Sequence, residues 1–259
     1  MLTLCHIKWL LPKVEPLQQI EQSNILWFAA TMPFEDLLRY ARLYSVPEGR
    51  FHPSRENIEH QFKLVKSIKN GGGLNEGINI VKSRKSGNSL VQKKLPIDYE
   101  DGLREILFLN VLKHPNIITY IDAYIPLGRS STGPSLYLEY CELGTLQDLI
   151  KTYLMQNDRY PKKAQAYIPE RFIWHVLESM ASALLYIHHG QSSDKYHAIS
   201  PKNWPSIVHR DIKPDNIFLR ESPGSEYPVV VLADFVSPFL RTARRLLTKI
   251  FSGHRYPFP

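Results

Sequence analysis

The chain has 259 residues, of which 43% are hydrophobic and 22% charged, so it can build one large folded domain or two small ones. This composition excludes collagen-like, mucin-like and wholly disordered proteins. The formal net charge is +7, but five cations and no acid lie in residues 236–259, which leaves +2 for the rest of the chain and no sign of a nucleic-acid-binding surface.

The first 60 residues are predicted to be a partly disordered extension that contains one amphipathic helix. Residues 34–44 have helical spacing, with Phe34, Leu37, Leu38 and Ala41 near one face. Prolines and a glycine between residues 47 and 53 then break the pattern.

Strand patterns dominate from residue 61 onward. Apolar and polar residues alternate, as in half-buried strands, and a glycine cluster lies between the first two candidates. A helix then ends at His114-Pro115-Asn116, because proline cannot continue the ladder of hydrogen bonds. The predicted strands are 62–68, 78–81, 89–95, 117–125 and 135–140, and the predicted helix is 101–112.

The pattern becomes helical after Gly144, with helices predicted at 146–154 and 169–189. The longer helix carries a broad apolar stripe, made of Ile173, Val176, Leu177, Met180, Leu184 and Ile187. Strands first and helices afterwards predict an α+β chain with two lobes.

Three separate features suggest a triphosphate site, although each has an ordinary alternative. Glycines such as Gly71, Gly73 and Gly77 let backbone N–H groups approach phosphates, but glycine clusters more often mark plain turns. Lys93 on the next strand could neutralise phosphate charge, or it could be a solvated lysine. Glu105 on the following helix could pair with Lys93, or it could be a surface carboxylate.

The decisive stretch is His209-Arg210-Asp211-Ile-Lys213-Pro-Asp-Asn216-Ile-Phe-Leu. It matches the catalytic loop of protein kinases, His-Arg-Asp followed after four residues by Asn, and the chain is identified on this string as a member of that family. Lys213 resembles the Ser/Thr-specific branch. His114-Pro-Asn-Ile and Glu139-Tyr-Cys-Glu together resemble the NIMA-like kinases.

This resemblance implies a role for each matched residue in transfer of the ATP γ-phosphate to protein Ser/Thr hydroxyls. Asp211 would accept or orient the substrate hydroxyl, and Lys213 would steady the γ-phosphate. Asn216 and Asp234 would bind Mg²⁺, with Asp234 at the position of Asp in Asp-Phe-Gly. Lys93 would contact the phosphates and pair with Glu105.

The resemblance also places the rest of the ATP site. Gly71, Gly73, Gly77 and Ile78 would cover the nucleotide, and the backbone at Glu139 and Cys141 would bind the adenine edge, with Leu138 as gatekeeper. Phe235, His209 and Leu109 would join a hydrophobic spine between the lobes. The implied fold is a kinase-like two-lobed α+β domain over residues 61–235, with an antiparallel sheet and one helix in the N-lobe (61–138), a hinge (139–144) and an incomplete helical C-lobe (145–235).

The chain departs from the family pattern at several positions. An ungapped alignment from Lys93 puts Glu76 at the third glycine of Gly-x-Gly-x-x-Gly, although a one-residue shift would restore Gly77. The spacing from Lys93 to Glu105 is short, which suggests a trimmed helix start, and residues 191–206 resemble an insertion. Val236 stands where glycine should follow Phe235, and no Ala-Pro-Glu follows.

Residues 236–259 are therefore predicted to be a non-kinase basic tail. Val236-Ser237 is what an in-frame splice donor would encode, so the tail is either intron-derived or a genuine divergent extension. We expect the chain to be an incomplete and inactive kinase. The alternative is a non-catalytic kinase-like module that binds a protein partner through its exposed C-lobe helix.

The cysteine and hydropathy patterns indicate a soluble intracellular protein, cytoplasmic or nuclear. Cys5 and Cys141 fit no metal or disulfide framework, so a reducing compartment is expected. His6 and Lys8 interrupt the apolar start of the chain, and no apolar run reaches the roughly 20 residues that a membrane helix needs. We expect ATP, Mg²⁺ and a protein substrate as partners, and neither nucleic acid nor membrane.

Overall fold

A computed structural model describes the chain over residues 60–68, 77–96, 100–125, 133–159, 165–191, 204, 206–235 and 239–240. The predicted helix at 34–44, most of the glycine cluster, most of the predicted insertion at 191–206 and nearly all of the basic tail lie outside these residues. Among the described helices, none combines the length and apolarity that crossing a bilayer requires.

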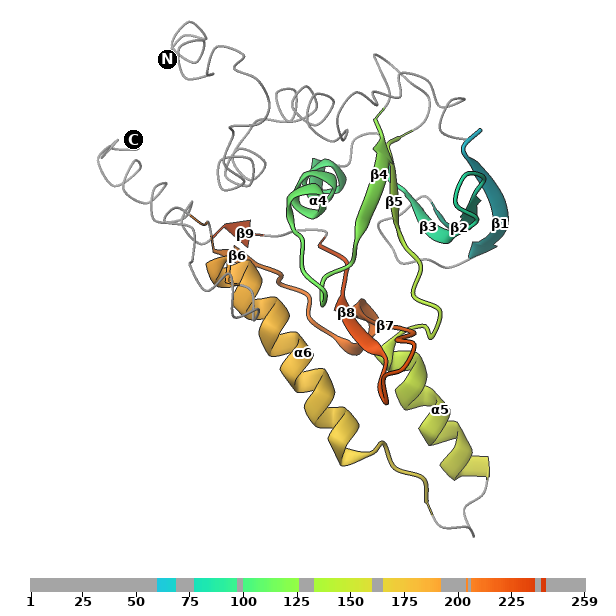
Figure 1. The fold of residues 1–259 in the computed structure, drawn as a ribbon, viewed down its shortest axis with the longest axis vertical. Coiled ribbons are helices and arrows are strands. Elements are labelled where there is room, and N and C mark those ends of the chain that lie inside the picture. The colour runs from blue at the N-terminus through green and yellow to red at the C-terminus, as the bar shows by residue number, and fades with distance from the viewer. Residues whose placement is uncertain are drawn as a thin grey trace, which may run out of the picture.

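The N-lobe is an antiparallel sheet with one helix, as predicted (Figure 1). Its strands lie in the order β1-β2-β3-β5-β4, and the register pairs Ile78 with Lys93 and Lys93 with Leu136. Helix α4 buries Leu107 and Phe108 completely, which joins it to the main core. The bounds are β1 Phe62–Ile68, β2 Gly77–Ser83, β3 Ser89–Lys94, α4 Glu100–Val111, β4 Tyr120–Tyr124 and β5 Ser135–Glu139.

The segment between α4 and β4 joins the N-lobe to the C-lobe, and here the predicted strand start at residue 117 is wrong. The N–H of Ile118 donates to the carbonyl of Leu232 at 2.9 Å, so this stretch pairs with β8 (Val229–Leu232) instead of continuing β4. The side chain of Asn116 donates to the carbonyl of Val230, and the ring of His114 stacks on Tyr186 of α6 at 5.1 Å. The loop after α4 is therefore held by C-lobe elements.

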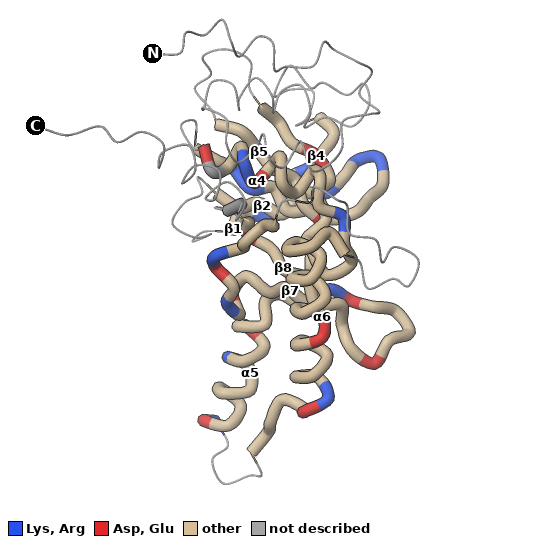
Figure 2. The backbone as a smooth tube through the Cα atoms, turned by 90° about the vertical axis from the view of Figure 1, so that its left-hand side faces the viewer, with Lys and Arg blue, Asp and Glu red and all other residues tan. Residues whose placement is uncertain are grey.

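The described residues of the C-lobe form two α-helices, short strand pairs and a 3-10 helix at Pro214–Asn216. In both views, α5 (Leu146–Arg159) and α6 (Glu170–His189) extend away from the region of β7 (Ile217–Arg220) and β8 (Figures 1 and 2). Strands β7 and β8 form an antiparallel pair. The strand β6 (Ile207–Val208) pairs with β9 (Phe239–Leu240), which lies in the region predicted to be the basic tail.

The start of helix α5 is fixed by a capping interaction between Thr145 and Asp148. The N–H and the hydroxyl of Thr145 both donate to Asp148 Oδ2, and the N–H of Asp148 donates back to Thr145 Oγ1 at 3.1 Å, a capping box. Gly144 precedes it with φ of 73°, and a Cβ there would lie 3.1 Å from Asp148 Oδ2. Glycine therefore fits this turn where other residues would be strained. The helix runs to Arg159, past the predicted end at 154.

The buried face of α6 is rotated from the predicted apolar stripe. Val176, Met180 and Ile187 are buried as expected, but Ile173 is 47% exposed and Leu177 is 52% exposed. Phe172, Ala183 and Tyr186 complete the buried face instead. Trp174, which is 63% exposed, lies with Ile173 and Leu177 on the open side. Part of the predicted stripe is thus exposed.

Two leucine-to-alanine substitutions provide a matched test of this burial pattern. We expect Leu107→Ala in α4 to lower the free energy of unfolding by about 2–5 kcal/mol, because it leaves a cavity in the core. Leu177→Ala in α6 should change it by no more than about 0.5 kcal/mol, as at a surface site. Urea unfolding of both variants measures the difference. An equally large loss in Leu177→Ala would mean that this face of α6 is covered in solution.

Candidate active site

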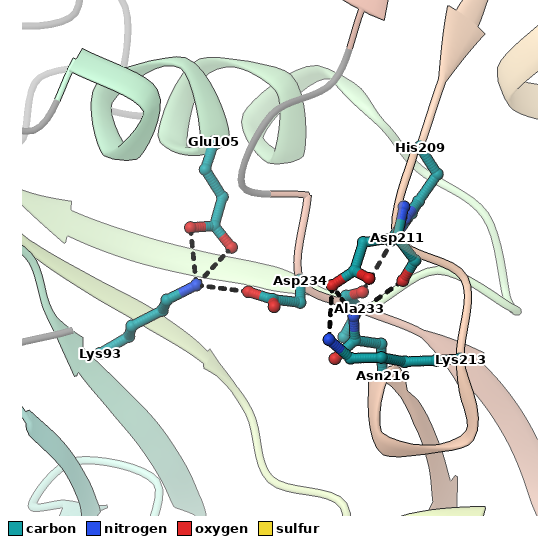
Figure 3. A network of polar contacts seen from close by, with 8 residues as sticks. All are labelled: Lys93, Glu105, His209, Asp211, Lys213, Asn216, Ala233 and Asp234. Carbon is teal, nitrogen blue, oxygen red and sulfur yellow. Dashed lines mark hydrogen bonds and ion pairs between the residues drawn. The ribbon is translucent and has the colours of Figure 1, made fainter. Parts of the chain in front are cut away.

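A buried ion-pair cluster joins three elements of the fold (Figure 3). Lys93 on β3 points toward α4, where its Nζ lies 3.0 and 2.9 Å from the two carboxylate oxygens of Glu105. The same Nζ lies 2.8 Å from Oδ1 of Asp234, which follows β8. Lys93 is 6% exposed and Glu105 is 0% exposed, so the predicted pair forms inside the protein. Glu105 lies in the first half of α4.

The charges in this cluster perturb one another. Burial favours the neutral form of Lys93, but the carboxylates of Glu105 and Asp234 outweigh it and raise the pKa of Lys93 above its usual value. Burial raises the pKa of Glu105, and the neighbouring Lys93 ammonium opposes this rise. The pairing therefore keeps Lys93 charged although water is excluded from it.

A second polar cluster lies in the loop after β6, next to the first (Figure 3). Lys213 Nζ lies 2.7 Å from Asp211 Oδ2, and the side-chain nitrogen of Asn216 donates to the backbone carbonyl and Oδ2 of Asp211 at 2.8 and 3.0 Å. The hydrogen bond from Lys213 lowers the pKa of Asp211, which is largely exposed. All three predicted catalytic-loop residues thus face one another.

His209 connects this loop to the segment that carries Asp234. The ring Nε2 lies 2.9 Å from the carbonyl of Ala233, so Nε2 carries the proton, and Nδ1 accepts the N–H of Asp211 at 3.3 Å. Burial lowers the pKa of His209. Its ring packs edge-on against Phe235 at 4.6 Å, and Leu109 is also fully buried.

Two residues of the site adopt left-handed backbone conformations. Arg210 has φ of 75° and Asp234 has φ of 66°, and they are the non-glycine residues with positive φ in the described part of the chain. Such conformations are costly for non-glycine residues and concentrate at functional sites. No feature of the sequence predicted these two backbone conformations.

The predicted hinge follows β5. Leu138 and Glu139 belong to the end of the strand, and Cys141 is buried, so that burial raises its thiol pKa to about 12. The backbone then approaches β7, where the N–H of Leu143 donates to the carbonyl of Leu219 at 3.2 Å.

The predicted phosphate-covering residues are described only in part. Gly71 and Gly73 lie outside the described residues, whereas Gly77 and Ile78 begin β2. Ile78 pairs with Lys93, so its backbone lies beside the cluster that Lys93 forms.

Sequence reasoning missed two residues of this region. Thr119 and Arg220 both contact the carboxylate of Glu139. Neither belongs to a recognisable motif, and they come from elements far apart in the sequence, so no local signal identifies them.

The sequence of the chain matches known protein kinases. The family model for the protein kinase domain matches residues 71–254. The chain is 30% identical over 210 residues to the G2-specific protein kinase fin1 of Schizosaccharomyces pombe, covering 76% of this chain and 26% of that protein. It is 30% identical over 182 residues to the Serine/threonine-protein kinase Nek2 of Mus musculus, covering 68% of this chain and 35% of that protein.

A third relative is the G2-specific protein kinase nimA of Emericella nidulans, 31% identical over 173 residues that cover 60% of this chain and 23% of that protein. The chain therefore spans about a quarter to a third of the length of these relatives. The match to the family model runs past Phe235, the predicted end of the kinase unit, and the origin of residues 236–259 stays a prediction.

The relatives confirm the predicted similarity to NIMA-like Ser/Thr kinases. The family model covers more than half of the chain, and the residues of its catalytic-loop motif lie together in the structure. On these grounds the chain belongs to the protein kinase family.

Proposed function

We propose that an active form of this protein transfers the γ-phosphate of ATP to Ser or Thr hydroxyls of protein substrates. The inactivity expected of the 259-residue chain itself stays a prediction. The observation that carries the proposal is the pairing of Lys93 with both Glu105 and Asp234, next to the Asp211 cluster. Phosphoryl transfer depends mainly on positioning and on neutralising charge, and these are the groups that such a reaction needs. The names of the relatives support a Ser/Thr protein kinase.

The proposed chemistry assigns the substrate hydroxyl to Asp211. The lowered pKa of its carboxyl means that Asp211 is ionised at neutral pH, so it can accept a hydrogen bond from the hydroxyl and orient it. Lys213, 2.7 Å from that carboxylate, would contact the transferred phosphoryl group. Lys93 would contact the other phosphates, with Glu105 fixing its side chain.

A divalent metal ion, expected to be Mg²⁺, fits the residues present. Asn216 uses its amide nitrogen for both bonds to Asp211, so its Oδ1 remains the atom suited to a metal. Asp234 binds Lys93 through Oδ1, which leaves Oδ2 as a second oxygen donor. Oxygen ligands of this kind are those that Mg²⁺ prefers, and the ion would neutralise phosphate charge when bound.

The adenine would bind at the hinge in this proposal. The backbone of Glu139 and Cys141 would form its hydrogen bonds, and Gly77 and Ile78, at the start of β2, would cover the nucleotide together with Gly71 and Gly73. We further propose an intracellular protein, cytoplasmic or nuclear.

A second candidate function is a non-catalytic module that binds a protein partner through α6. The exposed side chains of Ile173, Trp174 and Leu177 favour it, because neighbouring apolar residues on a surface often mark contact sites. The two candidates differ in nucleotide binding, which the first requires and the second does not.

Substitution of the cluster residues tests the proposed ATP site. We expect Lys93→Met to weaken binding of Mg²⁺ and a fluorescent ATP analogue at least tenfold, because a phosphate-binding charge is lost. The double variant Lys93→Met/Glu105→Gln should bind equally weakly, and it avoids leaving an unpaired buried carboxylate that could unfold the protein. Lys151→Met on exposed α5 is the matched control. Binding by the double variant within twofold of wild type would contradict the proposal.

Asp211→Asn separates binding from transfer. The amide keeps the shape of the side chain, so we expect nucleotide affinity within about twofold of wild type. Phosphotransfer is measured in a form of the protein that is active. It should fall by a factor of about 10² or more, as for loss of a group that assists proton transfer. Asp158→Asn on α5 is the control. Transfer that survives Asp211→Asn within a few fold would remove Asp211 from the assigned role.

The pH dependence of stability tests the part played by His209. Its folded pKa lies below the unfolded value because the neutral ring is buried, so its contribution is present above the unfolded pKa of about 6.5 and is lost as the pH falls through the folded pKa. We expect the melting temperature to fall less between pH 7.5 and pH 5.5 in His209→Gln than in wild type. An equal fall in both proteins would show that His209 does not titrate on unfolding.

A further inference from the structure

The carboxylate of Glu139 lies where the two lobes and the hinge meet. Its Oε1 accepts hydrogen bonds from the N–H and the hydroxyl of Thr119, both at 2.8 Å. Its Oε2 is paired with Nη1 of Arg220. The side chain of Glu139 is 13% exposed and that of Arg220 is 32% exposed, whereas Thr119 lies at the surface, so only the carboxylate itself is mostly shielded from water. We call these three residues the hinge tie.

Each member of the hinge tie belongs to a different part of the fold. Thr119 ends the segment between α4 and β4, just after residues that bind to β8. Glu139 is the last residue of β5, where the hinge begins, and Arg220 is the last residue of β7 in the C-lobe. One carboxylate therefore links both lobes to the hinge.

Backbone contacts extend this link on either side. The N–H of Glu139 donates to the carbonyl of Thr119 at 3.1 Å, and the N–H of Leu219 donates to the carbonyl of Gly144 at 2.9 Å. The N–H of Glu221, next to Arg220, donates to the side chain of Glu142 at 3.3 Å. The hinge is thus bound to β7 near both of its ends.

We propose that Thr119 and Arg220 are positioning residues for the adenine, acting through the carboxylate of Glu139. The proposal rests on the proposed function, in which the hinge backbone at Glu139 and Cys141 binds the adenine edge. The Glu139 carboxylate accepts hydrogen bonds from three donor groups on two distant segments, and hydrogen bonds to a charged group are stronger than those between neutral groups. Holding the hinge in one conformation before ATP arrives reduces the ordering that binding would otherwise require.

The structure also indicates the direction of the effect. The hinge tie is present together with the pairs of Lys93 with Glu105 and Asp234, so it is compatible with the assembled phosphate site. It touches none of the groups proposed to act on the γ-phosphate. Its loss should therefore weaken nucleotide binding and leave transfer from bound ATP nearly unchanged.

The test compares Arg220→Gln and Thr119→Val with Arg159→Gln, which removes an exposed arginine of α5. Binding of Mg²⁺ and a fluorescent ATP analogue, and hydrogen exchange of residues 139–144, are measured for each. We expect Arg220→Gln and Thr119→Val to raise the dissociation constant about three- to tenfold and to speed hinge exchange at least fivefold. Arg220→Lys keeps one N–H donor in reach of Glu139 and should restore both values to within about twofold.

The double variant Glu139→Gln/Arg220→Gln shows whether the two residues act as one unit. If they do, its dissociation constant should match that of Arg220→Gln instead of showing two separate losses. In a form of the protein that is active, the KM for ATP should rise while kcat stays within twofold. A variant that loses only melting temperature, with affinity and hinge exchange unchanged, would reduce the hinge tie to a structural role and overturn the proposal.

Two further outcomes would also overturn it. Tighter nucleotide binding by Arg220→Gln would mean that the hinge tie opposes the binding-competent state. Unchanged hinge exchange in both Arg220→Gln and Thr119→Val would mean that the carboxylate does not hold the hinge. If wild type binds no nucleotide, the proposed function fails, while hinge exchange still decides whether the hinge tie holds the hinge.

Discussion

The geometry of the site depends on a charge held away from water: the ammonium of Lys93, which lies between the carboxylates of Glu105 and Asp234. These three groups come from β3, α4 and the segment after β8, so a single cation fixes the helix to the sheet and the C-lobe to both. Removing one partner from such a buried set leaves a charge without compensation, which costs more than forming the pair gains. The cluster has one cation and two carboxylates, and its excess negative charge suits it to a divalent metal ion.

Around this cluster, the loop that carries the catalytic-loop motif is shaped by bonds between side chains and backbone more than by regular secondary structure. His209 accepts the N–H of Asp211 and donates to Ala233, while Asn216 binds the carbonyl of Asp211. These bonds flank Arg210 and Asp234, whose backbones are left-handed. They tie the loop to the segment that carries Asp234, and fixed positions of this kind are what the proposed phosphoryl transfer would require.

The sequence predicted much of this arrangement, because strand and helix periodicity reflects burial and because the catalytic-loop motif is long. The strands of the N-lobe, the helices and the Lys93–Glu105 pair followed from local patterns and from the family resemblance. Periodicity could not say which side of α6 is buried, since Ile173 and Leu177 are as apolar as their buried neighbours. The sequence did not predict the roles of Thr119 and Arg220, because both residues contact Glu139 from distant segments of the chain. A single residue type gives no information about such contacts.

The burial of Cys141 limits how a reagent can react with its thiol. Its thiol lies in the predicted hinge with a pKa of about 12, because burial and the nearby Glu139 carboxylate disfavour the thiolate. Since the thiolate is the reactive form, only a very small fraction of the protein would be nucleophilic at neutral pH. An electrophilic inhibitor aimed at Cys141 could not rely on rapid reaction with an activated thiol. Its selectivity would have to come from slow reaction within a long-lived complex.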